Sequence, residues 1–259
     1  AELAQPNDSI LKGYKKKFFV DKTWGGQEGS RYNAVEHTHA EFAGMITRLD
    51  YYVGEVLEKL KEKGLDENTI VIFSSDNGPH EEGGADPAFF GRDGKLRGLK
   101  RQCYEGGIRI PFIVRWPGHV PAGSVNEHQL AFYDIMPTFC ELVEDKAFPK
   151  KYINKKLADD CFDGISFVPA LLGDGEQREH EFLYWEFHET DQIGVRMGDW
   201  KMVVKKGIPH LYDLAADIHE DHDVAASHPD IVKRMAAIIK QEHRNSDDFQ
   251  VTLPVSFFF

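Results

Sequence analysis

The chain has 259 residues, enough for one large domain or two smaller ones with a substantial core. Its composition, 41% hydrophobic and 29% charged, is typical of a globular protein rather than a disordered one. The formal net charge of −12 argues against nucleic-acid binding, because phosphate backbones attract basic surfaces, and no apolar run approaches the length of a membrane span.

The amino-terminal third contains one strong helical pattern. Residues 1–36 are rich in turn formers and predict an irregular segment. Apolar residues then recur every three or four positions over 42–60, which predicts an amphipathic helix that ends at Gly64. His37 and His39 are two positions apart, so we expect them on different sides of the helix surface and not as joint metal ligands.

The middle of the chain has the pattern of an α/β domain. Residues 69–75 are apolar on both faces, as in a central strand that is covered by helices. A glycine-rich polar loop is expected over 78–107, then a short strand over 108–115 and a helix over 134–143.

The pattern of apolar and polar residues changes after Gly173. Short β-like runs with a turn at Gly198 predict an antiparallel meander, and the apolar spacing over 231–239 predicts a last helix. We therefore predict an α/β domain over 1–173 and a small α+β subdomain over 174–259.

The first predicted strand ends on polar side chains. Asp76 and Asn77 follow it directly, and open α/β sheets place ligands at the carboxyl ends of their strands. Carboxylate and amide oxygens suit Ca²⁺ or Mg²⁺, but two ligands are too few for a calcium shell. The spacing alone also fits a plain Asp-Asn-Gly-Pro turn.

A basic stretch follows in the glycine-rich loop. Residues 92–115 contain seven lysines and arginines and only two acids, inside an acidic chain. Such a patch beside a cation site predicts an oxyanion substrate such as sulfate, phosphate or carboxylate; the alternative is a solvated surface loop.

Several motifs, in this order, carry a specific resemblance. SSDNGPH, LRGLKRQCYEGGIRIPFIVRWPG, YDIMPTFCELV, FDGISFVPALLG and VRMGDWKMV resemble the second half of a type I, formylglycine-dependent sulfatase. This is the arylsulfatase branch of the alkaline-phosphatase superfamily. The resemblance implies a partial alkaline-phosphatase-like sheet between helices, with a small carboxyl-terminal subdomain that contains an antiparallel sheet.

The resemblance also implies roles for individual residues. Asp76 and Asn77 match the pair that coordinates the active-site calcium, and Lys100 matches the lysine that contacts the sulfate. His80 follows the metal pair and is expected either to contact substrate or to pack within its loop. The expected substrate pocket further includes Asp86, with a pocket-lining role, and His188, with a possible sugar contact against the alternative of an ordinary exposed histidine.

The expected nucleophile is missing from this chain. The family oxidises the first residue of a C/S-x-P-x-R motif to formylglycine, and neither Cys103, Cys140 nor Cys161 lies in such a motif, so all three are expected to be small packed hydrophobes. The resemblance implies that the chain is the carboxyl-terminal portion of a sulfatase, catalytically silent alone and able to self-associate through an uncovered apolar face.

The parent protein is therefore expected to hydrolyse sulfate esters, more specifically those of sulfated carbohydrates, with Ca²⁺ and formylglycine as cofactors. The resemblance favours a periplasmic or secreted bacterial protein, with no nucleic-acid or membrane partner. Two alternatives remain open at this point: a phosphohydrolase of the same superfamily, and a non-catalytic module that binds sulfated glycans.

Overall fold

The computed structural model of the chain describes residues 3–29, 31–91, 94–143 and 163–253. The helices are α1 (Ser9–Lys17), α2 (Thr38–Glu62), α3 (Glu105–Ile108), α4 (Ile135–Val143), α6 (Val168–Leu172) and α7 (Pro229–Glu242). The strands are β1 (Val71–Ser74), β2 (Phe112–Arg115), β3 (Leu183–Phe187), β4 (Gln192–Met197), β5 (Trp200–Lys205) and β6 (Ile208–Asp213). Short 3-10 turns are η1 (Asp66–Asn68), η2 (Glu82–Gly84), η3 (Phe132–Asp134), η4 (His188–Thr190) and η5 (Ala225–Ser227).

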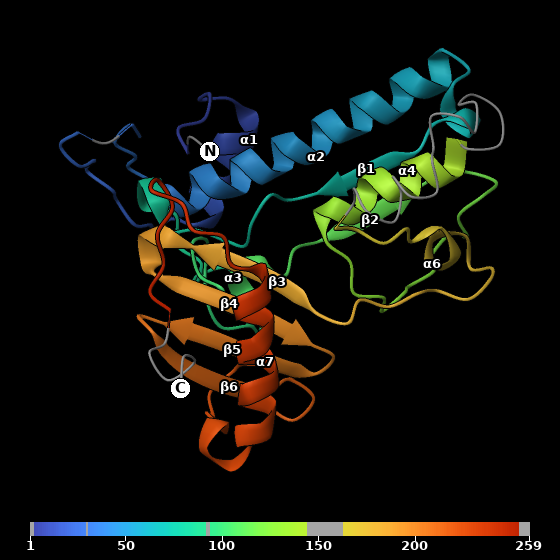
Figure 1. Ribbon diagram of the computed structural model, residues 1–259. Coiled ribbons are helices and arrows are strands. Elements are labelled where there is room, and N and C mark those ends of the chain that lie inside the picture. Colours follow the sequence, from blue (N-terminus) through green and yellow to red (C-terminus); the bar gives the residue numbers. More distant parts are fainter. Residues whose placement is uncertain (1–2, 30, 92–93, 144–162, 254–259) are drawn as a thin grey trace.

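In the part of the chain that the structure describes, two sheets lie in two regions (Figure 1). The long helix α2 runs beside the two-stranded sheet β1–β2, and the four-stranded sheet β3–β4–β5–β6 lies in the other region with α7 across it (Figure 1). None of the helices in the described part of the chain is both long and apolar enough to cross a membrane.

Helix α1 was not predicted from the sequence. Asp8 is its N-cap, and its Oδ1 accepts hydrogen bonds from the backbone N–H groups of Ile10 and Leu11 at 3.0 and 3.2 Å. Leu11 is buried and α1 packs against α2. The prediction of an irregular segment over 1–36 was therefore wrong for this stretch, where the Asp8 cap and the buried Leu11 stabilise a short helix.

Helix α2 contains the whole predicted helix over 42–60. His37 and His39 were both predicted to lie on the helix surface, and for His39 this was wrong. His37 is at the N-cap position, whereas His39 is only 7% exposed and is covered by residues far away in the sequence. The period of a helix shows which residues share a face, but not what covers that face.

The first sheet is shorter than predicted. β1 and β2 pair antiparallel, with Val71 opposite Arg115. The predicted loop over 78–107 and strand over 108–115 were wrong at their junction, because the helical turn α3 occupies Glu105–Ile108. Its glycines permit a very close backbone approach: a Cβ on Gly107 would lie 2.1 Å from the carbonyl oxygen of Gln102.

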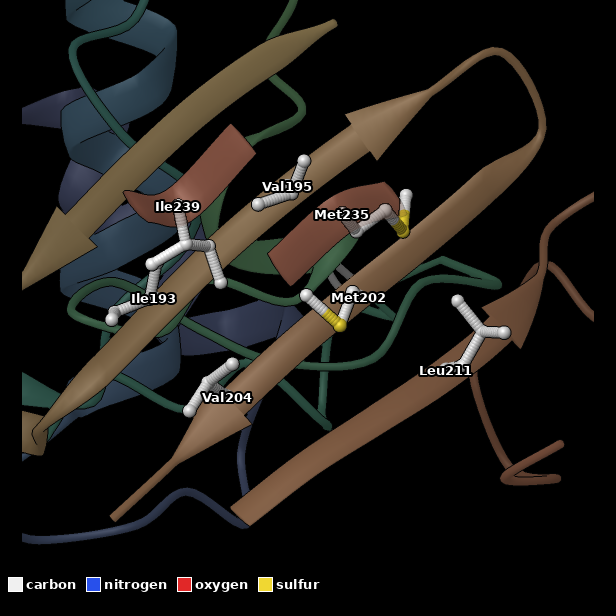
Figure 2. Close-up of a cluster of buried hydrophobic side chains, with 7 residues drawn as sticks. All are labelled: Ile193, Val195, Met202, Val204, Leu211, Met235 and Ile239. Carbon is white, nitrogen blue, oxygen red and sulfur yellow. The ribbon is translucent and has the colours of Figure 1, made fainter. Parts of the chain in front are cut away.

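The second sheet confirms the predicted antiparallel meander. Each strand pairs with the next, and Gly198 supplies the positive φ of 59° in the β4–β5 turn. Side chains alternate between the two faces with a period of two. On one face, α7 covers a closed core (Figure 2), formed by Ile193, Val195, Met202, Val204, Leu211, Met235 and Ile239.

The opposite face of this sheet is covered by the segment that leads into α3. Cys103 and Tyr104 pack there against Val203 and Tyr212. Burial raises the pKa of the Cys103 thiol to about 11, so it behaves as the predicted small hydrophobe. Cys140 is half-buried, and Cys161 lies outside the described residues.

Candidate functional site

The predicted cation ligands lie where β1 ends against a second loop. The Gly78 N–H donates to the Gly107 carbonyl at 2.9 Å. A Cβ on Gly78 would lie 1.9 Å from the Gly106 carbonyl oxygen, so only glycine fits at this contact. The turn that carries Asp76 and Asn77 is therefore fixed directly against the first turn of α3.

Lys100 is fixed to the same turn. Its backbone N–H donates to the Pro79 carbonyl at 2.8 Å, which aligns the loop that carries it with the residues after Asn77. Its ammonium group donates to Glu82 Oε2 at 3.3 Å. An ammonium has three donors, so this pair leaves further donors for an anion.

Glu82 organises the positive charges around it. Tyr32 donates to its Oε2 at 2.7 Å, and Arg101 forms an ion pair with its Oε1. The Tyr32 hydroxyl, then the Arg101 and Lys100 cations, lower the pKa of Glu82 to about 2. Lys100 and Arg101 therefore bring two cations to the turn after β1, balanced by Glu82 and, at Arg101, by Glu189.

An open groove passes this turn. Asp76, Asn77 and Lys100 all line it, together with side chains of β3 such as Trp185 and Glu186. Asp76 is exposed and Asn77 is half-buried. The structure thus brings together, in one groove, the three residues predicted to bind metal and sulfate.

The other three predicted residues do not line this groove. His80 is next to Glu82, and its Nδ1 accepts the Glu82 N–H at 3.0 Å, so it stabilises the loop. Asp86 contacts Lys22 rather than any predicted site residue. His188 is exposed and its ring lies 4.5 Å from that of Phe249.

Sequence reasoning missed the residues that hold Lys100 in place. Glu82, Tyr32 and Arg101 had no motif of their own, and Tyr32 is 50 positions away from its partner. The sequence offers one indication that Arg101 belongs to the site: it directly follows Lys100 in the basic loop. It also donates to Glu189 Oε2 at 2.8 Å and so connects Glu82 to η4 in the second region.

The donor set fits part of a calcium shell. Asn77 Nδ2 donates to the Gly78 carbonyl at 2.8 Å, which leaves the amide Oδ1 as the atom available to a cation. Asp76 adds a solvent-exposed carboxylate, and both are hard oxygen donors. Within the described ranges no group of three or more His, Cys, Asp or Glu side chains could hold a metal, so these two ligands make only part of a site.

A buried charge cluster fastens the loop of Lys100 to the second sheet. Glu105 in α3 is 1% exposed and contacts Lys201 Nζ at 3.1 Å and Arg196 at 2.8 Å. The Glu105 N–H donates to the carboxylate of Glu220 at 2.8 Å, and Arg97 reaches the Glu220 carbonyl. Because Lys201 is fully buried, this cluster makes β4 and β5 part of the support of the site.

Two family models match the chain. The model described as sulfatase matches residues 7–145, and that described as N-sulphoglucosamine sulphohydrolase, C-terminal, matches residues 98–245. An N-acetylgalactosamine-6-O-sulfatase of Bacteroides thetaiotaomicron is 31% identical over 78% of this chain and 43% of its own length. A steryl-sulfatase of Rattus norvegicus is 35% identical over 79% of this chain and 40% of its own length. The chain thus spans less than half the length of these curated relatives.

Solved structures agree in fold. A protein described in connection with glycosaminoglycan metabolism by Bacteroides thetaiotaomicron has a TM-score of 0.62 at 29% identity, over 78% of this chain and 44% of its own. The phosphonate monoester hydrolase of Agrobacterium radiobacter has a TM-score of 0.58 at 21% identity, over 97% and 54% of the two chains, and supports the fold alone. The fold is the predicted α/β, alkaline-phosphatase-like one, and the chain belongs to the sulfatase family.

Proposed function

We propose that this chain is the carboxyl-terminal portion of a calcium-dependent sulfatase that hydrolyses sulfate esters of carbohydrates. The observation that carries the proposal is the contact between two loops. The turn with Asp76 and Asn77 and the loop with Lys100 are joined by backbone hydrogen bonds, and all three side chains line one groove.

The chemistry of these side chains suits a sulfate ester. Hydrolysis breaks the bond between sulfur and the ester oxygen, and negative charge develops on that oxygen and on the sulfuryl oxygens. A bound Ca²⁺ ion supplies positive charge for those oxygens. Lys100 would donate hydrogen bonds to the same group and remain oriented by Glu82, with which it is already paired. The formylglycine nucleophile belongs to the part of the protein that this chain does not contain.

A carbohydrate substrate is supported by the relatives. The 31% identical protein is named for a sulfated sugar, N-acetylgalactosamine 6-sulfate, as its substrate. A 28% identical structure with a TM-score of 0.62 is described as a complex with a neocarrahexaose, an oligosaccharide. In this chain Asp76 and Asn77 would hold the metal and Lys100 would bind the sulfate. Of the other residues predicted for the pocket, His80 would support the loop of Glu82, and Asp86 and His188 do not line the groove.

The proposal that the chain is a portion of a longer protein rests on its surface as well as on its length. Several large apolar side chains of α2, β1, β2 and α4 are exposed, among them Val56, Phe73, Ile113 and Met136. A stable monomer rarely exposes so many apolar residues in one region. We propose that the rest of the parent covers them, that the isolated chain is catalytically silent, and that it self-associates through this surface. A periplasmic or secreted location is proposed from the bacterial relatives.

Turnover by the complete protein tests this function. The value of kcat/KM is measured for 4-methylumbelliferyl sulfate and for the matched phosphate, each with and without a calcium chelator. We expect the sulfate to be preferred at least about tenfold and its turnover to fall on chelation. A preference for the phosphate would favour the phosphohydrolase alternative. Salt-dependent binding of sulfated glycans without any turnover would favour a non-catalytic module.

A further inference from the structure

Lys100 lies in a tight turn with an unusual backbone. The Gln102 N–H donates to the Leu99 carbonyl at 3.0 Å, so Lys100 and Arg101 occupy the two central positions of a β-turn. Arg101 has a φ of 74°, in the left-handed region that a type II turn requires at its second central position. Glycine or asparagine normally supplies this conformation, because a larger side chain strains it. An arginine at this position therefore needs contacts that offset the strain.

The contacts that hold Arg101 come from two distant segments. Its guanidinium forms an ion pair with Glu82 in η2, which belongs to the first region. Its Nε donates to Glu189 Oε2 at 2.8 Å, and its backbone carbonyl accepts a hydrogen bond from the Thr190 hydroxyl. Glu189 and Thr190 both lie in η4 of the second region. The strained residue of the turn is thus held through its side chain and its backbone together.

Arg101 also limits how strongly Glu82 attracts Lys100. Glu82 Oε1 pairs with Arg101, while Oε2 accepts from the Tyr32 hydroxyl at 2.7 Å and from Lys100 Nζ at 3.3 Å. The contact to Lys100 is long for a hydrogen bond, because the carboxylate is shared with two other donors. Without the guanidinium, both carboxylate oxygens would attract the ammonium group and draw it away from an anion in the groove.

We propose that Arg101 and Glu189 are positioning residues for the reaction, through which η4 orients Lys100 toward the sulfate ester. Arg101 lines the groove beside Lys100, whereas Glu189 does not line it, so Glu189 would act only through Arg101. The reaction to which this orientation contributes rests on the proposed function. The strained turn and its contacts to η2 and η4 are features of this chain.

Amide hydrogen exchange in the 259-residue chain, followed by NMR, tests the positioning without any substrate. The Lys100 N–H donates to the Pro79 carbonyl at 2.8 Å, so its exchange rate reports how firmly the turn is held. We expect exchange to be about tenfold faster in Arg101→Gly, which permits the positive φ but removes both ion pairs, and severalfold faster in Glu189→Gln. The control Arg234→Ala, on the exposed surface of α7, should leave the rate unchanged. An unaltered rate in Arg101→Gly would overturn the proposal.

Turnover of 4-methylumbelliferyl sulfate by the complete protein tests the consequence for the reaction. We expect kcat to fall about tenfold in Arg101→Gly and about threefold in Glu189→Gln, with smaller changes in KM, because Lys100 would stabilise charge that develops in the transition state. Arg101→Lys, which keeps the charge without the planar fork, should lie between wild type and Arg101→Gly.

A double substitution separates this role from a general loss of stability. Because Glu189 would act through Arg101, Glu189→Gln should lower kcat no further in the Arg101→Gly background. Independent effects of the two substitutions, or a wild-type kcat in Arg101→Gly, would overturn the positioning role. Absence of sulfate turnover in wild type would contradict the proposed function instead, and the exchange of the Lys100 N–H would still decide whether Arg101 and Glu189 hold the turn.

Discussion

The two regions of the molecule differ in how completely their cores are closed. The second sheet is covered by α7 on one face and by the segment around Cys103 on the other, and Val195, Met202 and Leu211 are fully buried. In the first region, β1 and β2 pair only with each other among the described residues, and Ile113 of β2 is 59% exposed. We therefore expect the second region to be the more stable of the two, because its apolar side chains are buried on both faces of the sheet.

The candidate site lies at the junction of these two regions. Asp76 and Asn77 come from the open region, whereas the loop of Lys100 is held by buried charges of the closed one through Glu105. The closed region therefore acts as a rigid support for the residue proposed to bind sulfate. Four predictions test this difference between the two regions.

The largest loss of stability is expected from Lys201→Met. Removal of the buried ammonium leaves the Glu105 carboxylate with Arg196 at 2.8 Å and Arg109 at 4.0 Å, and breaking a buried pair costs about 3–5 kcal/mol. Urea unfolding followed by intrinsic tryptophan fluorescence measures the effect. Lys205→Met, on the same strand but exposed, is the control and should change stability by less than about 0.5 kcal/mol. Equal effects of the two substitutions would contradict the structural role of the cluster.

A leucine pair compares the two regions directly. Leu211→Ala removes a fully buried side chain and should cost about 3 kcal/mol in the free energy of unfolding. Leu49 of α2 is 46% exposed, and Leu49→Ala should cost less than about 1 kcal/mol in the isolated chain. The same urea titrations give both values. A large loss in Leu49→Ala, measured at a protein concentration at which the chain is monomeric, would show that the first region is closed within the chain itself.

The buried Glu220 should make stability depend on pH. Burial raises the pKa of its carboxyl to about 7, against the nearby Lys201 and Arg97 cations, which lower it. The folded state therefore binds the proton more tightly than the unfolded state, and stability falls as pH rises from about 4.5 to about 7.

Glu220→Gln keeps the oxygen that accepts the Glu105 N–H but cannot ionise. Its stability relative to wild type should rise by roughly 2 kcal/mol between pH 5 and pH 8, because one pKa unit corresponds to about 1.4 kcal/mol. Urea unfolding at both values of pH measures this difference. A constant difference across that range would show that Glu220 keeps an ordinary pKa.

The smallest effect is expected at Tyr32. Tyr32→Phe removes the hydroxyl that contributes most to the low pKa of Glu82, so that pKa should rise toward its ordinary value. The lost hydrogen bond should cost about 1 kcal/mol of stability. The carboxyl chemical shift of Glu82, followed by NMR through a pH titration, measures the change. An unaltered titration would mean that Arg101 and Lys100 alone keep the pKa of Glu82 low.

Local patterns and ordered motifs predicted much of this fold. The apolar stripe over 42–60 and the alternating runs after Gly173 gave the long helix and the meander, because each reports a local periodicity. The helical turn at α3 could not be read from the sequence, since its two glycines serve close tertiary contacts instead of helix propensity.

The candidate site was only partly predictable for a similar reason. Asp76, Asn77 and Lys100 were found because they lie in ordered family motifs, and the structure brings them to one groove. Their support was missed: Glu82, the partner of Lys100, is oriented by Tyr32 through a contact that no spacing rule encodes. Contacts between buried polar residues of distant segments depend on the tertiary fold, so local sequence patterns do not predict them.

The central claim, that Lys100 faces a sulfate ester beside a cation held by Asp76 and Asn77, is tested most directly in the complete protein. The measurement is kcat/KM for 4-methylumbelliferyl sulfate in wild type, in Lys100→Met and in the control Lys95→Met, a nearby exposed lysine. We predict a loss of about 10²–10³-fold for Lys100→Met, the size typical of one lost charge-stabilising donor, and less than about threefold for Lys95→Met. A Lys100→Met protein that retains wild-type kcat/KM would contradict the claim.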